Sequence, residues 1–147
     1  MDQENYLTEM ETLFLALSDK TRLRILNLLR DKEICVYYFT EILKESQPKI
    51  SRHLAYLKSA GIVSTRREGK WIHYRIKTPA SIFADNILQN ALKWLASQKD
   101  MQGDYTKLLE LKDTGAASEN EIAESAHIFE QANIRRNQKE ELETFML

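Results

Sequence analysis

At 147 residues the chain is long enough for one domain with a hydrophobic core and a short appendage. Its 43% hydrophobic and 29% charged residues are typical of a folded globular protein, and no apolar run approaches the roughly 18 residues needed to cross a bilayer. The N-terminus is acidic, unlike a secretory signal, and a single cysteine excludes an internal disulfide, so we expect a cytoplasmic protein with no membrane partner.

The net charge of -1 conceals a strong asymmetry along the chain. Residues 44–77 contain nine Lys and Arg against two acidic residues, a local charge of +7, whereas residues 1–43 sum to -3 and residues 100–147 to -6. A basic centre between acidic ends is expected of a protein that binds nucleic acid. The alternative is a solvated basic face that binds no partner.

The first third of the chain predicts short helices and one short extended segment. Residues 6–17 carry an apolar helical stripe at Leu7, Met10, Leu13, Phe14 and Leu17. Ser18 and Asp19 are candidate caps for a second helix over residues 20–30. Residues 33–36 favour a small strand or an extended link, and residues 38–44 favour a brief helix.

The segment that follows predicts a helix with two distinct faces. Ser46 is a capping residue, Pro48 lies in the first turn, and Gly61 is a stop signal after Ala60. One face is apolar, at Ile50, Leu54 and Leu57. The other face offers donors, positive charge and an aromatic ring without any acid, at Lys49, Arg52, His53 and Tyr56. Such a helix fits the major groove of DNA.

Residues 62–67 and 71–76 are both strand-like, and the Glu68-Gly69-Lys70 sequence between them is typical of a turn. This hairpin carries Arg66, Arg67 and Lys70 near its tip. Two short helices followed by a basic hairpin describe a winged helix-turn-helix. We therefore predict a mostly α fold with a small β-hairpin.

Pro79 opens a long helix to about Lys99 whose apolar stripe, with that of residues 6–17, exceeds what a small domain can bury alone. We expect these long terminal helices to have a partner that buries them, and residues 1–99 to form one domain. Residues 100–147 form an acidic extension, partly helical or disordered. Within it, residues 105–111 predict a helical turn or two, and Ser118 with Glu121 begins a weakly amphipathic segment at 122–133.

Several of these motifs, in the same order, resemble the ArsR (arsenic-repressor) family of bacterial transcription factors. The likeness covers residues 13–76: the segment from Leu13 to Leu26, the Glu33-Ile-Cys-Val sequence, the helix from Ser46 to Lys58, Gly61-Ile-Val and the Arg67-Glu-Gly-Lys-Trp hairpin. The resemblance implies a homodimer whose first and last long helices pack together, so that residues 1–99 are the DNA-binding and dimerisation domain. Each subunit then places one recognition helix and one wing on palindromic double-stranded DNA.

By that likeness the helix over residues 47–60 enters the major groove. Gln47, Ser51, Arg52 and His53 would then contact base edges or lie near them, and Arg67 and Lys70 would reach phosphates, with Lys49, Tyr56 and Arg66 on the same basic surface. Ser46 would be a cap first and a phosphate contact second. For His53 the alternative is a half-buried histidine without DNA contact, and for Arg67 and Lys70 it is solvated charge.

Family members that sense arsenite carry Cys-Val-Cys where this chain has Cys35-Val36-Tyr37, so the second thiol is missing. Soft metal ions require several thiolates, and we therefore predict no arsenite site, with Cys35 a weak candidate ligand. The zinc pattern of some relatives is also incomplete, because Asp85 is followed by Ile87 rather than histidine, and His127 stands alone. We expect no cofactor, and the effector is unknown.

No nucleophile motif, Gly-rich phosphate loop or carboxylate–histidine cluster indicates an enzyme. The leading hypothesis is a homodimeric, sequence-specific transcriptional repressor. The alternatives are a winged-helix module that binds other proteins, and a regulator that responds to oxidants through Cys35 or to an organic effector near Tyr37 and Tyr38. Acidic neighbours such as Glu33 and Glu41 favour a structural role for Cys35.

Overall fold

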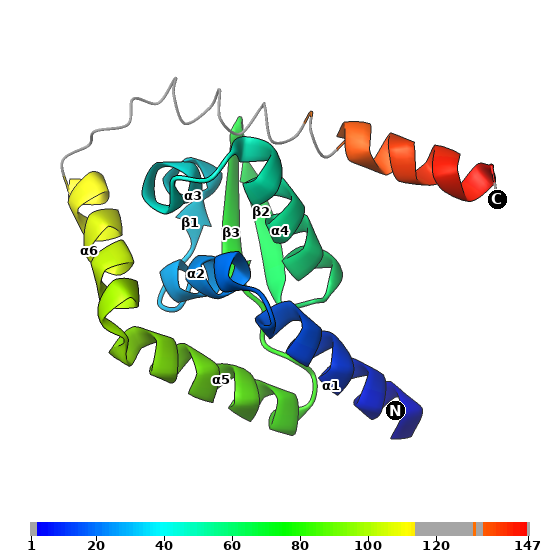
Figure 1. Cartoon of the computed structure of the whole chain (residues 1–147), viewed down its shortest axis with the longest axis horizontal. Coiled ribbons are helices and arrows are strands. Elements are labelled where there is room, and N and C mark those ends of the chain that lie inside the picture. The colour runs from blue at the N-terminus through cyan, green and yellow to red at the C-terminus, as the bar shows by residue number, and fades with distance from the viewer. Residues whose placement is uncertain (1–2, 114–130, 132–133, 147) are drawn as a thin grey trace.

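The computed structural model describes residues 3–113, 131 and 134–146. Figure 1 shows a mostly helical molecule with one small sheet. The elements are α1 (Gln3–Leu17), α2 (Lys20–Leu28), β1 (Ile34–Cys35), α3 (Val36–Leu43), α4 (Gln47–Ser59), β2 (Val63–Glu68), β3 (Trp71–Ile76), α5 (Ile82–Ser97) and α6 (Lys99–Asp113). Residues 134–145 form a further C-terminal helix.

The helix-turn-helix consists of α3, a three-residue turn and α4. Lys44 takes the left-handed conformation at φ 56°, and the Ser46 hydroxyl then accepts the backbone N–H of Lys49 and caps α4. At the other end Gly61 lies at φ 75°, and the Ile62 N–H donates to the Leu57 carbonyl at 3.1 Å. This Schellman closure ends α4 at its expected boundary.

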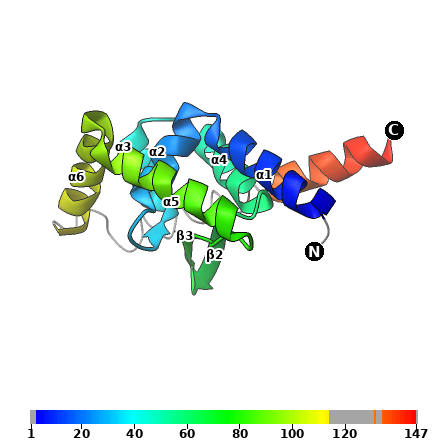
Figure 2. The same ribbon diagram turned by 90° about the horizontal axis from the view of Figure 1, so that it is seen from below.

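The three strands form one antiparallel sheet in the order β1-β3-β2. A two-residue turn, with Gly69 at φ 61°, joins β2 to β3 in the register that pairs Glu68 with Trp71. The short strand β1 pairs Cys35 with His73. Seen from below, the hairpin of β2 and β3 projects away from the helices as a wing (Figure 2).

The core lies between α2, α3, α4 and α5, and α6 completes it. Fully buried side chains come from every one of these helices, among them Leu26, Phe39, Ile50, Leu88 and Leu108. The α6 helix packs along α2, α3 and α5 and is much longer than the one or two turns expected at residues 105–111. Its contacts to α2 join residues about 75 positions apart, which local sequence patterns do not register.

The long helix α5 begins at Ile82 behind a Ser81 cap, three residues later than Pro79 suggested. It lies beside α1, where the Ser81 N–H donates to Glu9 Oε1 at 3.3 Å. No helix in the described part of the chain is long and apolar enough to cross a membrane. The Ser118 capping pattern, the segment at 122–130 and His127 lie outside the described residues.

Candidate nucleic-acid interface

The apolar positions of α4 determine which of its side chains face outward. Ile50, Leu54 and Leu57 are buried against the body, so Arg52, Tyr56 and Lys58 are exposed on the opposite side. The Tyr56 ring lies 4.4 Å beneath the Arg22 guanidinium, which orients the ring through a cation–π contact. Two further predicted side chains, Gln47 and Lys49, are half-buried in the first turn. Lys49 Nζ lies 3.1 Å from Glu45 Oε1.

Two predicted contact residues of α4 face inward. Ser51 is only 3% exposed, because it follows Ile50 around the buried side of the helix. His53 packs against the start of α2, with its Nδ1 3.7 Å from Asp19 Oδ1 and 3.4 Å from Arg22 Nη1. Burial lowers the pKa of His53, and the nearby arginines and lysine lower it further although Asp19 opposes them. His53 is therefore half-buried, as in the alternative that the sequence offered for this residue.

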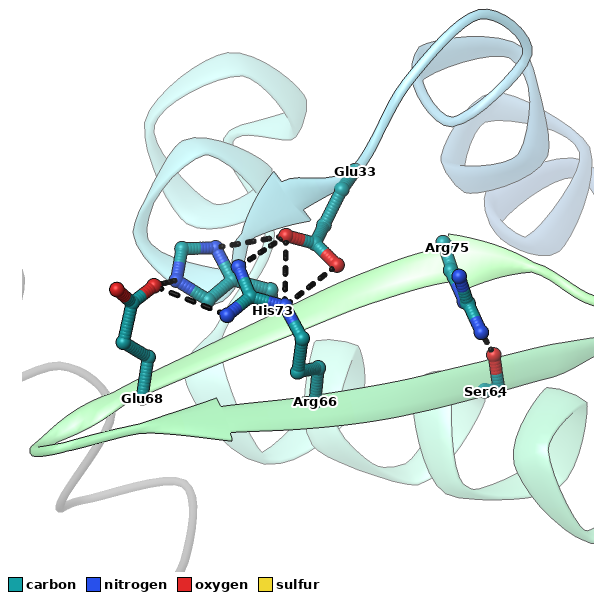
Figure 3. Close-up of polar contacts among 6 residues, drawn as sticks. All are labelled: Glu33, Ser64, Arg66, Glu68, His73 and Arg75. Carbon is teal, nitrogen blue, oxygen red and sulfur yellow. Dashed lines mark hydrogen bonds and ion pairs between the residues drawn. The ribbon is translucent and has the colours of Figure 1, made fainter.

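The wing separates its two neighbouring arginines onto opposite faces, since side chains alternate along a strand. Figure 3 shows Arg66 on the face that carries Glu33, Glu68 and His73. Its Nε donates to Glu33 Oε2 at 3.1 Å and its Nη1 to Glu68 Oε2 at 3.0 Å. These hydrogen bonds raise the pKa of Arg66 and lower that of Glu33. Arg66 therefore ties the wing to the segment before β1.

Arg67 lies on the other face of the wing, toward α4. It lines a hollow of about 840 Å³ between α4 and the sheet, and the same hollow is lined by Arg52, Tyr56 and Lys58. Lys70 is exposed in the turn at the wing tip. The structure thus brings Arg52, Tyr56 and Arg67 together and adds Lys58, which the sequence analysis did not single out. Lys58 reaches the hollow because the last turns of α4 pack against β2.

The start of the C-terminal helix borders the same hollow, through Ile134, Arg136, Asn137 and Glu140. The basic surface between α4 and the wing is therefore flanked by part of the acidic extension.

Cys35 is buried in β1, and burial raises the pKa of its thiol. A protonated thiol is a poor nucleophile and a poor metal ligand. Among the described residues no three or more His, Cys, Asp or Glu side chains are grouped so that they could hold a metal ion. Asp85 instead accepts a hydrogen bond from Gln89 in the first turns of α5.

Comparison with known proteins identifies the family. The model of the bacterial regulatory protein, arsR family, matches residues 19–65, from the cap of α2 into β2. The arsenical resistance operon repressor of Escherichia coli K12 is 43% identical over 91 residues, which are 61% of this chain and 76% of that repressor. The chain belongs to the ArsR family. It is accordingly a DNA-binding transcriptional regulator and not an enzyme.

Solved structures of transcriptional regulators share the fold of this chain. The transcriptional repressor BigR from Xylella fastidiosa is 28% identical, with a TM-score of 0.56 over 67% of this chain and 94% of BigR. The winged helix-turn-helix domain of Mb0332 from Mycobacterium bovis, described as homodimeric and DNA-binding, is 28% identical with a TM-score of 0.51. It is covered over 91% of its length and covers 66% of this chain. The predicted fold class is confirmed.

Proposed function

We propose that this ArsR-family regulator is a homodimeric repressor that binds a palindromic operator in the cytoplasm, with α4 in the major groove and the wing against the DNA backbone. The observation that carries the proposal is the convergence of Arg52, Tyr56, Lys58 and Arg67 on one surface between α4 and the wing. Positive charge from two elements on one surface is the electrostatic footprint of a protein that binds the phosphates of a duplex. A repressor of this kind acts by occupying DNA that the transcription machinery needs.

Within this surface, roles follow from exposure and donor geometry. We assign base-edge contacts to Arg52 and Gln47, since a guanidinium pairs with guanine and an amide with adenine. We assign phosphate contacts to Lys58, Arg67 and Lys70 and to the exposed Ser46 hydroxyl and Lys49. Because Ser51 is buried, His53 packs on α2 and Arg66 is bonded to two carboxylates, we assign these three residues to positioning α4 and the wing rather than to DNA contact.

The homodimer is supported by an exposed apolar surface on the two long helices. On α1 it includes Phe14 and Leu15, and on α5 it includes Ile82, Phe83 and Trp94, with Phe83 72% exposed. A monomer that exposes large apolar side chains on adjacent helices has an interaction surface. A two-fold axis through this face would present two α4 helices to successive major grooves on one side of a duplex.

Replacing Arg52 with Ala is expected to weaken operator binding about 10- to 100-fold and to relax base preference at one position of each half-site. A bidentate arginine–base contact contributes about 1–3 kcal/mol. Fluorescence anisotropy on duplexes selected from random DNA measures both effects. Lys107→Ala, which removes the same charge from the exposed surface of α6, is the matched control and should bind like the parent. Equal affinity of Arg52→Ala and the parent would refute the assignment of Arg52.

Arsenite and zinc are expected to leave the protein on its operator, with less than about a twofold change in affinity. The chain has one cysteine, and its thiol is buried and protonated at neutral pH. The same anisotropy assay with each ion added tests this expectation, and Cys35→Ala should respond like the parent. Release of the parent by arsenite, with loss of that release in Cys35→Ala, would make Cys35 a sensor.

A further inference from the structure

The C-terminal helix at residues 134–145 borders the proposed DNA-binding surface and then extends past the body of the protein (Figure 1). Its side chains differ in exposure, since that of Arg136 is 25% exposed and that of Lys139, less than one turn later, is 77% exposed. Arg136 therefore faces the hollow between α4 and the wing, and Lys139 faces solvent. Three further residues of this helix line the hollow: Ile134, Asn137 and Glu140.

The other walls of the hollow carry side chains that the proposed function assigns to DNA. Arg52 lines it from α4 and Arg67 from the wing. Tyr74 of β3 also lines it, and burial raises the pKa of Tyr74 to about 12, although the charge of Arg136 opposes that shift. The Arg136 guanidinium therefore lies near the buried phenol, between the recognition helix and the sheet.

A duplex and the C-terminal helix cannot occupy this surface together. The major groove is about 12 Å wide and admits one helix. Two helices in direct contact have axes about 8–10 Å apart and are each about 10 Å across, so they span about 20 Å. With the C-terminal helix across the hollow from Arg52, α4 cannot enter the groove deeply enough for Arg52 to reach base edges.

The charges around the hollow keep this contact weak. The cations that line it from α4 and the wing are Arg52, Lys58 and Arg67. Arg136 adds a further positive charge to them, and like charges repel. The Glu140 carboxylate, with its Oε1 3.8 Å from Arg136 Nε, offsets only part of that repulsion. Phosphates neutralise the same cations, so DNA displaces the helix when enough of it is present.

We propose that the C-terminal helix is an autoinhibitory element. In the closed form it blocks the surface between α4 and the wing, and in the open form it leaves that surface to DNA. This inference rests on the proposed function, which identifies the blocked surface as the one that binds DNA. The measured affinity is then the intrinsic affinity multiplied by the fraction of open chains. The contact therefore sets the protein concentration at which an operator is occupied.

Breaking the helix without changing its charge tests the proposal in the full-length chain. Gln138→Pro interrupts the helix between residues that line the hollow, because proline removes a helical hydrogen bond and clashes with the preceding turn. Affinity for a duplex selected from random DNA, measured by anisotropy, is expected to rise about three- to tenfold, as for a surface blocked in about 70–90% of chains. Gln138→Ala keeps the helix and should bind like the parent.

Reversing a charge on either side of the helix gives a second test. Arg136→Glu places a carboxylate among the cations of the hollow, which should hold the helix closed and weaken DNA binding about threefold or more. Lys139→Glu makes the same change of charge on the solvent side and should stay within about twofold of the parent. Adding Gln138→Pro to Arg136→Glu should restore the affinity of the parent, which a lost DNA contact of Arg136 would not allow.

Nuclear magnetic resonance without DNA distinguishes failure of this proposal from failure of the proposed function. The amide resonances of Ala55 and Ser59, which line the hollow from α4, are expected to differ between the parent and Gln138→Pro. Identical resonances overturn autoinhibition, and so does a parent that binds DNA as tightly as Gln138→Pro or more tightly. If the resonances differ and no form binds duplex DNA, the proposed function is wrong and autoinhibition of DNA binding is overturned with it.

Discussion

A chain that ends at Lys99 is expected to unfold, whereas a chain that ends at Asp113 is expected to keep its fold. Helix α6 supplies Asp104, which is 6% exposed and accepts hydrogen bonds from Arg24 Nε at 2.9 Å and Nη2 at 3.1 Å. It also supplies the fully buried Leu108, and the Met101 carbonyl accepts the side-chain amide of buried Asn27 at 2.9 Å.

The size of the effect follows from what these contacts contribute. Breaking a buried ion pair costs about 3–5 kcal/mol, and deleting a buried leucine side chain costs about 2–5 kcal/mol. Arg24 is partly exposed, which places its pair with Asp104 at the lower end of that range. Against a total stability of about 5–15 kcal/mol, losing the whole helix removes most of the margin. Urea unfolding followed by circular dichroism measures the difference between the two shortened chains.

Two point variants in the full-length chain refine this expectation. Asp104→Ala should lower the urea midpoint clearly, because it leaves Arg24 without its carboxylate partner, while Asp100→Ala, at an exposed position one turn earlier, should change it little. A chain ending at Lys99 with the midpoint of the parent would show that α6 is dispensable. The chain ending at Asp113 also tests whether residues 114–147 compete with DNA for the basic surface. If they do, the operator affinity of this shortened chain at low salt should equal or exceed that of the parent.

Replacing Phe83 with Glu is expected to dissociate the dimer through α1 and α5, raising its dissociation constant at least about a hundredfold. Burying a phenylalanine side chain stabilises an interface by about 1.5–3 kcal/mol, and a symmetric interface loses that contribution twice. The introduced carboxylates would in addition be desolvated in an apolar contact. Since Phe83 is largely exposed in one chain, the monomer itself should fold normally.

Light scattering gives the mass of Phe83→Glu, and anisotropy gives its affinity for a full palindrome and for a half-site. We expect affinity for the palindrome to fall toward that for the half-site, because two linked recognition helices bind more tightly than one. Thr106→Glu, at an exposed position on α6, is the control and should remain dimeric. A dimeric Phe83→Glu with unchanged operator affinity would place the dimer interface elsewhere.

Local signals in the sequence were sufficient for most of the helix and strand boundaries. The Ser46 cap, the stop at Gly61 and the turn at Gly69 act through their own backbone and near neighbours, so they operate in the isolated sequence much as in the fold. The apolar stripe of α4 likewise determined which side of that helix is buried. The order of these motifs was enough to indicate the winged helix-turn-helix and the family.

Packing between distant segments decided the rest. In the sequence, nothing distinguishes Asp104 from an exposed acidic residue. The structure buries it because α6 packs against α2, where Arg24, eighty residues earlier in the chain, donates to it. Strand alternation separates Arg66 from Arg67, but only the contact of the sheet with α4 shows that Arg67 faces the recognition helix while Arg66 binds Glu33. By helical spacing alone His53 shares a face with Arg52, and it is half-buried only because α2 lies beside it. Local pattern determined which elements form and which surface is basic, and long-range contacts determined which of those charges remain available to DNA.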